Sequence, residues 1–222
     1  MRRLILLSVT LLAVVAHACD VWQMPAVTSA DSPLLAAVSQ RLGAETVVDQ
    51  RFVQDKRLRI LKRPLRTEGL MLYRAGLGVC WHTERPVAST LVLGEDELRQ
   101  LSDDNELVLK AEQQPALFGF SRLFFAALAG QVEGLGDQFE LRVAGSEDHW
   151  QLGLLPRAEA LSRFIGRMEL RGGRSVEQVL MTDREGDITE IRFAPLGAMP
   201  PQDGATSETG AVAALERRCF GD

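Results

Sequence analysis

The chain has 222 residues, of which 46% are hydrophobic and 25% are charged, the balance of an ordinary globular protein. This composition excludes a disordered, collagen-like or coiled-coil chain. The formal net charge of −5 argues against a nucleic-acid partner, and three cysteines are too few for a small disulfide scaffold.

Residues 1–18 have the features of a secretory signal peptide. Arg2 and Arg3 form a positively charged N-terminal region, and residues 4–16 form an apolar stretch without charge. Ala16-His17-Ala18 then places small residues at a cleavage site. The apolar run is too short to span a bilayer comfortably. We therefore expect a mature chain that begins at Cys19 and resides in the periplasm.

Cys19 follows the predicted cleavage site directly, where a bacterial lipoprotein carries its lipid. His17 fits the sequence before a lipidated cysteine poorly, so a plain soluble form is favoured over outer-membrane anchoring. An oxidising compartment also allows a disulfide. A Cys80–Cys219 bridge would leave Cys19 free for a lipid, whereas a Cys19–Cys219 bridge would leave Cys80 as a thiol.

The first predicted helix covers residues 32–43. Ser32-Pro33 opens it, because a proline in the first turn lacks only an N–H that has no helical partner, and Gly43 ends it. Its apolar residues fall on one face: Leu34, Leu35, Val38 and Leu42.

From residue 45 the hydrophobic period changes to two, which indicates β-strands. The strands expected in this part of the chain cover residues 45–54, 56–62, 69–73, 78–84, 88–93 and 105–112. Between the last two, residues 94–101 are expected to form one or two helical turns.

The predicted strand at 56–62 begins the densest positive region of this acidic chain. Its alternation would place Leu58 and Ile60 on one face and Arg57 and Arg59 on the other. One interpretation is a docking site for anionic lipid headgroups or for an acidic partner surface. The docking cations would be Lys56, Arg57, Arg59, Lys62 and Arg63. The alternative is a strand with a solvated polar face.

Residues 114–130 are almost continuously apolar. Pro115 near the start and Gly130 at the end predict a helix, which carries Phe118, Phe120, Phe124 and Phe125. About sixteen helical residues span roughly 24 Å, too short for a bilayer. Such a helix must be covered by protein or lie in a hydrophobic groove.

The C-terminal half predicts further strands at 138–145, 149–156, 167–172, 175–183 and 187–193, with a short helix at 156–164. Residues 197–210 are linker-like, and 211–220 predict a last short helix. The strands are apolar on one side only, the pattern of an antiparallel sheet with one covered face. About ten such strands should curl around the apolar helices into a barrel or part-barrel.

The sequence offers no catalytic or metal-binding motif. His82 and His149 lie far apart, without cysteine or carboxylate clusters at metal-ligand spacing. There is no nucleophile elbow and no P-loop. We therefore expect a protein that is not an enzyme and uses no cofactor or metal.

Four motifs in residues 45–93 resemble the periplasmic outer-membrane lipoprotein carrier (LolA) family. They are Phe52-Val53-Gln54, Gly69-Leu70-Met71-Leu72-Tyr73, Gly78-Val79-Cys80-Trp81 and Arg85-Pro86. The order of elements extends the resemblance to about residue 196. It implies a mainly β fold with helices, in which an unclosed antiparallel β-barrel covers internal or lid helices. The domain would span 19–196, followed by a tail at 197–222.

The resemblance also implies a function. A monomeric member would shield the acyl chains of a lipoprotein or related lipid, taking this cargo from an inner-membrane release complex to an outer-membrane acceptor. The alternative is a non-transport binding module, either a sensor or, with a lipidated Cys19, an outer-membrane-anchored acceptor.

Cavity-lining residues follow from the same resemblance together with the apolar periods. They are Trp81, Phe118, Phe120, Phe124, Phe125, Leu128, Phe139, Leu141, Trp150, Leu152, Met168 and Leu170. Arg74 is the candidate for the family's lid-holding arginine, although no proline follows it.

Overall fold

The computed structural model of the protein describes residues 20–95, 97–101, 106–110, 112–113, 115–128, 134–198 and 208–221, without the side chains of 115–117 and 120. The predicted signal peptide and Cys19 lie outside these residues. No helix in the described part of the chain is both long and apolar enough to cross a membrane.

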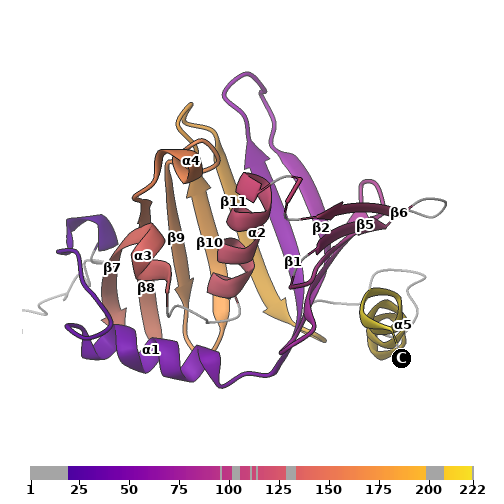
Figure 1. The fold of residues 1–222 in the computed structure, drawn as a ribbon, viewed down its shortest axis with the longest axis horizontal. Helices are drawn as coiled ribbons and strands as arrows, with labels where there is room; N and C mark the ends of the chain where they lie inside the picture. Colours follow the sequence, from indigo (N-terminus) through magenta and orange to yellow (C-terminus); the bar gives the residue numbers. More distant parts are fainter. Residues whose placement is uncertain are drawn as a thin grey trace, which may run out of the picture.

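An open antiparallel sheet forms most of the described structure (Figure 1). Its strands are β1 (Val47–Arg57), β2 (Leu65–Arg74), β3 (Gly78–Arg85), β4 (Ser89–Leu93), β5 (Glu97–Leu101), β6 (Glu106–Lys110), β7 (Phe139–Ser146), β8 (His149–Pro156), β9 (Arg167–Gly172), β10 (Val176–Thr182) and β11 (Ile188–Pro195). They follow the order β6-β5-β4-β3-β2-β1-β11-β10-β9-β8-β7. Since the end strands β6 and β7 do not pair, the predicted unclosed curved sheet is confirmed.

The helices lie on both sides of this sheet. They are η1 (Val21–Gln23), α1 (Pro33–Gly43), α2 (Pro115–Leu128), α3 (Leu135–Gln138), α4 (Glu159–Ser162) and α5 (Glu208–Phe220). Figure 1 shows α2 across the inner face and α5 beyond the other side of β2 and β5. The Ser32 hydroxyl caps α1 by accepting a hydrogen bond from the Leu35 N–H at 3.2 Å, as Ser-Pro sequences at helix starts favour.

Strand β2 separates two hydrophobic clusters, because successive side chains of a strand point to opposite faces. Met71 and Tyr73 join the inner cluster under α2, whereas Leu70 and Leu72 join an outer cluster. The outer cluster is completed by side chains of α5: Val212, Leu215 and Cys219. The expectation of one covered face is therefore wrong at β2 and β3, where both faces are covered.

Two local predictions are also wrong. Residues 97–101 form β5 instead of helical turns, since hydrogen bonding to β4 and β6 outweighs the local sequence preference. The two strands expected at 45–54 and 56–62 are one strand that pairs with β11 as far as Arg57 and then turns. Ile60 consequently lies in the turn and is 89% exposed.

The C-terminal helix is longer than expected and begins at Glu208. It packs on β2 and β3 and is not detached from the sheet. The division of the chain at residue 196 stays a prediction.

Candidate functional site

An aromatic cluster on the inner face fixes α2 to the sheet. Trp81 of β3 stacks on Phe52 of β1 with ring centroids 4.0 Å apart. It meets Phe124 of α2 edge-on and Phe125 in a tilted arrangement, at centroid distances of 6.3 and 5.9 Å. Such pairs add about 0.5–1.5 kcal/mol each beyond the burial of their area. The helix therefore covers the sheet through specific ring contacts.

Gly69 explains how rings from β1 and β3 can meet across β2. It pairs with Phe52 and lies between these two strands, where it has no side chain to separate the rings. A Cβ at Gly69 would lie 1.9 Å from the carbonyl oxygen of His82, so no other residue fits this close approach of β2 and β3.

A pocket of about 350 Å³ opens beside α2, near the turn that joins β2 to β3. This volume is within the usual range of small-molecule sites. Val79, Leu93 and Phe125 give it apolar walls, and Glu95 and Arg122 are its charged residues. The remaining lining residues are Tyr73, Gly76, Gly78, Gly94 and Ala126.

The structure brings the described cavity candidates into one inner cluster. Phe118, Phe124, Phe125 and Leu128 are buried on α2, and Trp81 packs against them from β3. The candidates on β7, β8 and β9 are all at most 2% exposed: Phe139, Leu141, Trp150, Leu152, Met168 and Leu170. The side chain of Phe120 lies outside the described residues.

Only part of the candidate list borders the pocket. Phe125 lines it, whereas the candidates on β7, β8 and β9 do not, and the helices α1 and α3 pack on β7. Their role in cargo binding stays a prediction. Val79 and Leu93 line the pocket but were not among the predicted cavity residues. The period of two places Val79 on the face of Trp81, whereas Leu93 joins that face only through the register that pairs it with Val79.

Arg74 faces away from α2. The prediction that Arg74 holds a lid helix is therefore corrected. Its Nη1 donates to Asp49 Oδ1 and its Nε to Glu216 Oε1 of α5, both at 2.6 Å. Burial alone would lower the pKa of Arg74, but these hydrogen bonds outweigh it and raise the pKa. In the described structure Arg74 therefore anchors α5 to the outer face.

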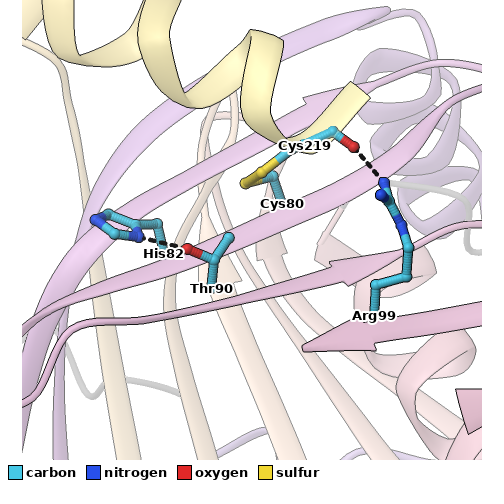
Figure 2. Close-up of a disulfide and its surroundings, with 5 residues drawn as sticks. All are labelled: Cys80, His82, Thr90, Arg99 and Cys219. Atoms are coloured by element: carbon cyan, nitrogen blue, oxygen red, sulfur yellow. Dashed lines mark hydrogen bonds between the residues drawn. A yellow bond between two sulfur atoms is a disulfide. The ribbon is translucent and has the colours of Figure 1, made fainter. Parts of the chain in front are cut away.

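A disulfide between Cys80 and Cys219 joins β3 to α5 across a Cα–Cα distance of 6.0 Å (Figure 2). It settles the pairing that the sequence left open and does not involve Cys19. Beside it, Arg99 donates to the backbone carbonyl of Cys219, and His82 Nδ1 lies 2.8 Å from Thr90 Oγ1. Burial lowers the pKa of His82, so this imidazole is neutral at pH 7.

Acid should weaken the attachment of α5. Hydrogen bonds from Arg51 and Arg74 lower the pKa of Glu208 and Glu216 below the ordinary value of 4.5. A carboxyl with a lowered folded-state pKa stabilises the fold above its ordinary pKa, and this contribution is lost as pH falls through the lowered value. Thermal unfolding measured between pH 7 and 3 should show this loss below about pH 4.5.

The double variant Glu208→Gln/Glu216→Gln should be unfolded over the same pH range and compared with the unmodified chain. It should begin less stable at pH 7 and lose less stability on acidification than the unmodified chain. Parallel curves for the two proteins would contradict the attribution to these carboxyls.

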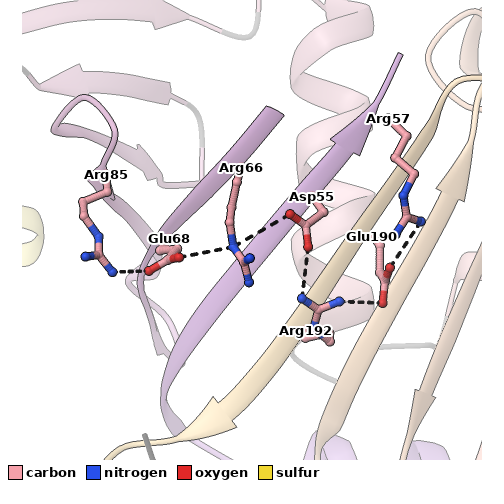
Figure 3. Close-up of polar contacts among 7 residues, drawn as sticks. All are labelled: Asp55, Arg57, Arg66, Glu68, Arg85, Glu190 and Arg192. Carbon is pink, nitrogen blue, oxygen red and sulfur yellow. Dashed lines mark hydrogen bonds and ion pairs between the residues drawn. The ribbon is translucent and has the colours of Figure 1, made fainter. Parts of the chain in front are cut away.

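The predicted docking cations do not form a strand face. Lys56 and Arg57 end β1, and Arg59, Lys62 and Arg63 lie in the turn to β2, all of them exposed. Arg57 belongs to a row of alternating charges that crosses the outer face from β3 to β11 (Figure 3). The row consists of Arg85, Glu68, Arg66, Asp55, Arg192, Glu190 and Arg57.

Comparison with protein families gives one clear match and comparison with solved structures gives several distant ones. The structure of a LolA superfamily protein from Nitrosomonas europaea is 9% identical, with a TM-score of 0.41, covering 76% of this chain and 96% of that chain. A putative outer membrane lipoprotein-sorting protein domain from Vibrio parahaemolyticus is 11% identical, with a TM-score of 0.37 and coverages of 82% and 98%.

The Pseudomonas aeruginosa MucA/MucB complex structure is 15% identical, with a TM-score of 0.39 and coverages of 79% and 60%. No curated protein sequence matches the chain. The family assignment rests instead on the family model described as outer membrane lipoprotein carrier protein LolA-like, which matches residues 27–221. The chain therefore belongs to the LolA-like family of outer membrane lipoprotein carrier proteins.

Proposed function

We propose that this protein is a periplasmic carrier that shields the acyl chains of a lipoprotein or related lipid from water. The observation that carries the proposal is the apolar inner face of an unclosed sheet, covered by α2 and bordered by a pocket of about 350 Å³. Membership of the LolA-like family supports the same function.

The physical need for a carrier lies in the cost of exposing acyl chains to water. Burial stabilises each methylene group by about 0.8 kcal/mol, so a few acyl chains together keep a lipoprotein in a membrane unless a protein covers them. A curved sheet whose end strands do not pair can admit a chain between its inner face and a helix without breaking strand hydrogen bonds. We propose in addition that the protein receives its cargo from an inner-membrane donor and delivers it to an outer-membrane acceptor.

The pocket beside α2 is the proposed entry for an acyl chain. Its walls come from β3, β4 and α2, so a chain entering there would slide between Phe125 and the strands toward Trp81. Displacement of α2 would then enlarge the space, since the contacts that join the described side chains of this helix to Trp81 are ring contacts.

The direct test is to purify the secreted protein without detergent and to analyse it by native mass spectrometry and lipid extraction. A bound species of acyl-chain mass, or stoichiometric uptake of a fluorescent fatty acid, is expected. Protein that is free of lipid and takes up no probe would contradict the carrier function.

Filling the pocket should block this uptake. Ala126 lines the pocket from α2 and is half-buried, so Ala126→Trp places a large ring at the entry. We expect the affinity for the fatty-acid probe to fall at least about tenfold, which corresponds to 1.4 kcal/mol. Ala36→Trp on the exposed side of α1 is the matched control and should bind the probe normally. Equal affinities for the two variants would place the entry elsewhere.

A non-transport binding module is the second candidate. Its support is the closely filled half of the interior under α1 and α3, where Leu35, Phe139 and Trp150 are at most 1% exposed. Such a module would recognise a partner with its surface and hold no lipid. Failure of probe uptake, together with stable capture of an envelope protein, is the result that would favour it.

A further inference from the structure

The turn between β1 and β2, residues 58–64, projects from one edge of the sheet. The pairing of β1 with β11 ends at Arg57, and β2 begins at Leu65, so neither strand continues into the turn. Figure 1 shows this turn as a purple loop that rises beyond the other elements at that edge. We call residues 56–66 the hairpin tip.

The hairpin tip exposes large apolar side chains. Ile60 is 89% exposed, and Leu61 and Leu65 are 44% and 50% exposed. Val87 after β3 and Phe164 before β9 are exposed at the same edge of the sheet, two and three strands away from β1. Single exposed apolar residues are ordinary, but three within one hairpin tip, namely Ile60, Leu61 and Leu65, mark an interaction site.

The hairpin tip is also strongly basic. It contains six lysines and arginines and no acidic residue, in a chain whose net charge is −5. Arg57 and Arg66 pair with carboxylates of the charged row on the outer face. Within the described residues, no ion pair joins a carboxylate to the other four cations: Lys56, Arg59, Lys62 and Arg63.

The tip is held in place by the neighbouring turn between β10 and β11. The backbone N–H of Arg59 donates to Asp187 Oδ1 at 2.8 Å, and the side chain of Arg59 passes close to Gly186. A surface that is already ordered before binding loses little conformational entropy when it binds.

We propose that the hairpin tip docks the protein on the surface of an anionic lipid bilayer. Ile60 and Leu61 enter the headgroup region, while Lys62, Arg63 and the flanking cations contact lipid phosphates. Apolar side chains surrounded by lysine and arginine are the composition that binds an anionic membrane surface. An acidic protein would satisfy the cations but would not require Ile60 at the tip.

This inference goes beyond the proposed carrier function, because it concerns the outer surface and not the interior. It would let the protein approach a membrane with one edge of the sheet facing the lipid. The net negative charge of the rest of the chain would turn the remaining surface away from the same bilayer.

The test is co-sedimentation of the full secreted chain with vesicles of phosphatidylcholine, with and without phosphatidylglycerol. We expect binding only to the anionic vesicles, and weaker binding as salt is raised. Each cation near the surface is worth about fivefold in affinity, so Lys62→Ser/Arg63→Ser should weaken binding roughly 25-fold. Ile60→Ser should weaken it about tenfold through lost apolar burial.

Matched controls remove the same groups from the opposite edge of the sheet. Lys110→Ser/Arg174→Ser removes two exposed cations there, and Leu77→Ser removes a side chain that is 56% exposed. Both controls should keep wild-type binding. Equal losses of vesicle binding in the tip and control variants would overturn the proposal. It would also be overturned if the unmodified chain did not bind anionic vesicles but bound soluble polyglutamate through the tip.

Fatty-acid uptake measured on the same variants separates this inference from the carrier function. The tip variants should take up the probe as the unmodified chain does, because residues 58–64 do not line the pocket.

Discussion

Trp81→Ala should cost about 3 kcal/mol of folding free energy and loosen α2. The substitution removes the stack on Phe52 and the ring contacts with Phe124 and Phe125. Losing a large core side chain costs about 3–5 kcal/mol, and partial exposure of Trp81 places the expected value at the lower end. For a domain of this size, the midpoint of thermal unfolding should fall by roughly 6–12 °C.

Hydrogen exchange distinguishes loss of the helix contact from general destabilisation. Amides of α2 should exchange faster in the Trp81→Ala protein, while those of β9 and β10 keep their relative protection. Trp22→Ala is the matched control, since Trp22 is also half-buried but lies beside Gly153 of β8 and carries a contact with Arg167. Faster exchange of α2 in both proteins would contradict a specific role for Trp81.

Cys80→Ser/Cys219→Ser should destabilise the protein by about 2–4 kcal/mol and release α5. The bridge links residues 139 positions apart, so it strongly limits the unfolded chain. Without it, α5 is held by its apolar contacts and by ion pairs such as Arg74–Glu216, and partly exposed ion pairs contribute about 1 kcal/mol or less. Release of α5 would uncover Leu70 and Leu72 on the outer face.

Limited proteolysis and binding of an apolar fluorescent dye measure this release. The cysteine variant should be cut near α5 and bind more dye than the unmodified chain, and reduction of the unmodified chain should reproduce both effects. Glu216→Gln, which removes one ion pair and leaves the bridge, should resemble the unmodified chain. Resistance of the cysteine variant to both assays would show that the apolar cluster alone holds α5.

The proposed carrier function and the proposed membrane docking use different parts of one sheet. The inner face and its pocket are the proposed cargo site, whereas the hairpin tip at one edge is the proposed contact with the bilayer. α5 covers the outer face of β2 and β3 and leaves both regions accessible. Variants in each region can therefore be tested separately.

Much of the fold follows from periodicity within the chain. The period of two from residue 45 predicts most of the strands, and the proline–glycine pattern of 114–130 predicts α2 at Pro115–Leu128. Phe52, Gly69 and Trp81 occur in the motifs that carry the family resemblance, and the structure brings all three together under α2. These predictions succeed because local spacing decides which face of a strand or helix is apolar.

Other features depend on contacts between distant segments. Residues 97–101 become a strand because β4 and β6 flank them. Arg74 finds its partners on the outer face because α5 brings Glu216 there, next to Asp49. The choice of Cys219 as the partner of Cys80 has the same origin.

Periodicity and short motifs were enough to predict the apolar faces of the strands, the phenylalanine-rich helix and the resemblance to the LolA family. Contacts between distant segments were needed to show that α5 covers a second face, that a pocket opens beside α2, and that Ile60 lies in a projecting turn. The physical reason is that a period along the chain records which side of an element is buried. It does not show which distant element buries that side. It also does not show where the pairing of a strand with its neighbour ends and the chain turns.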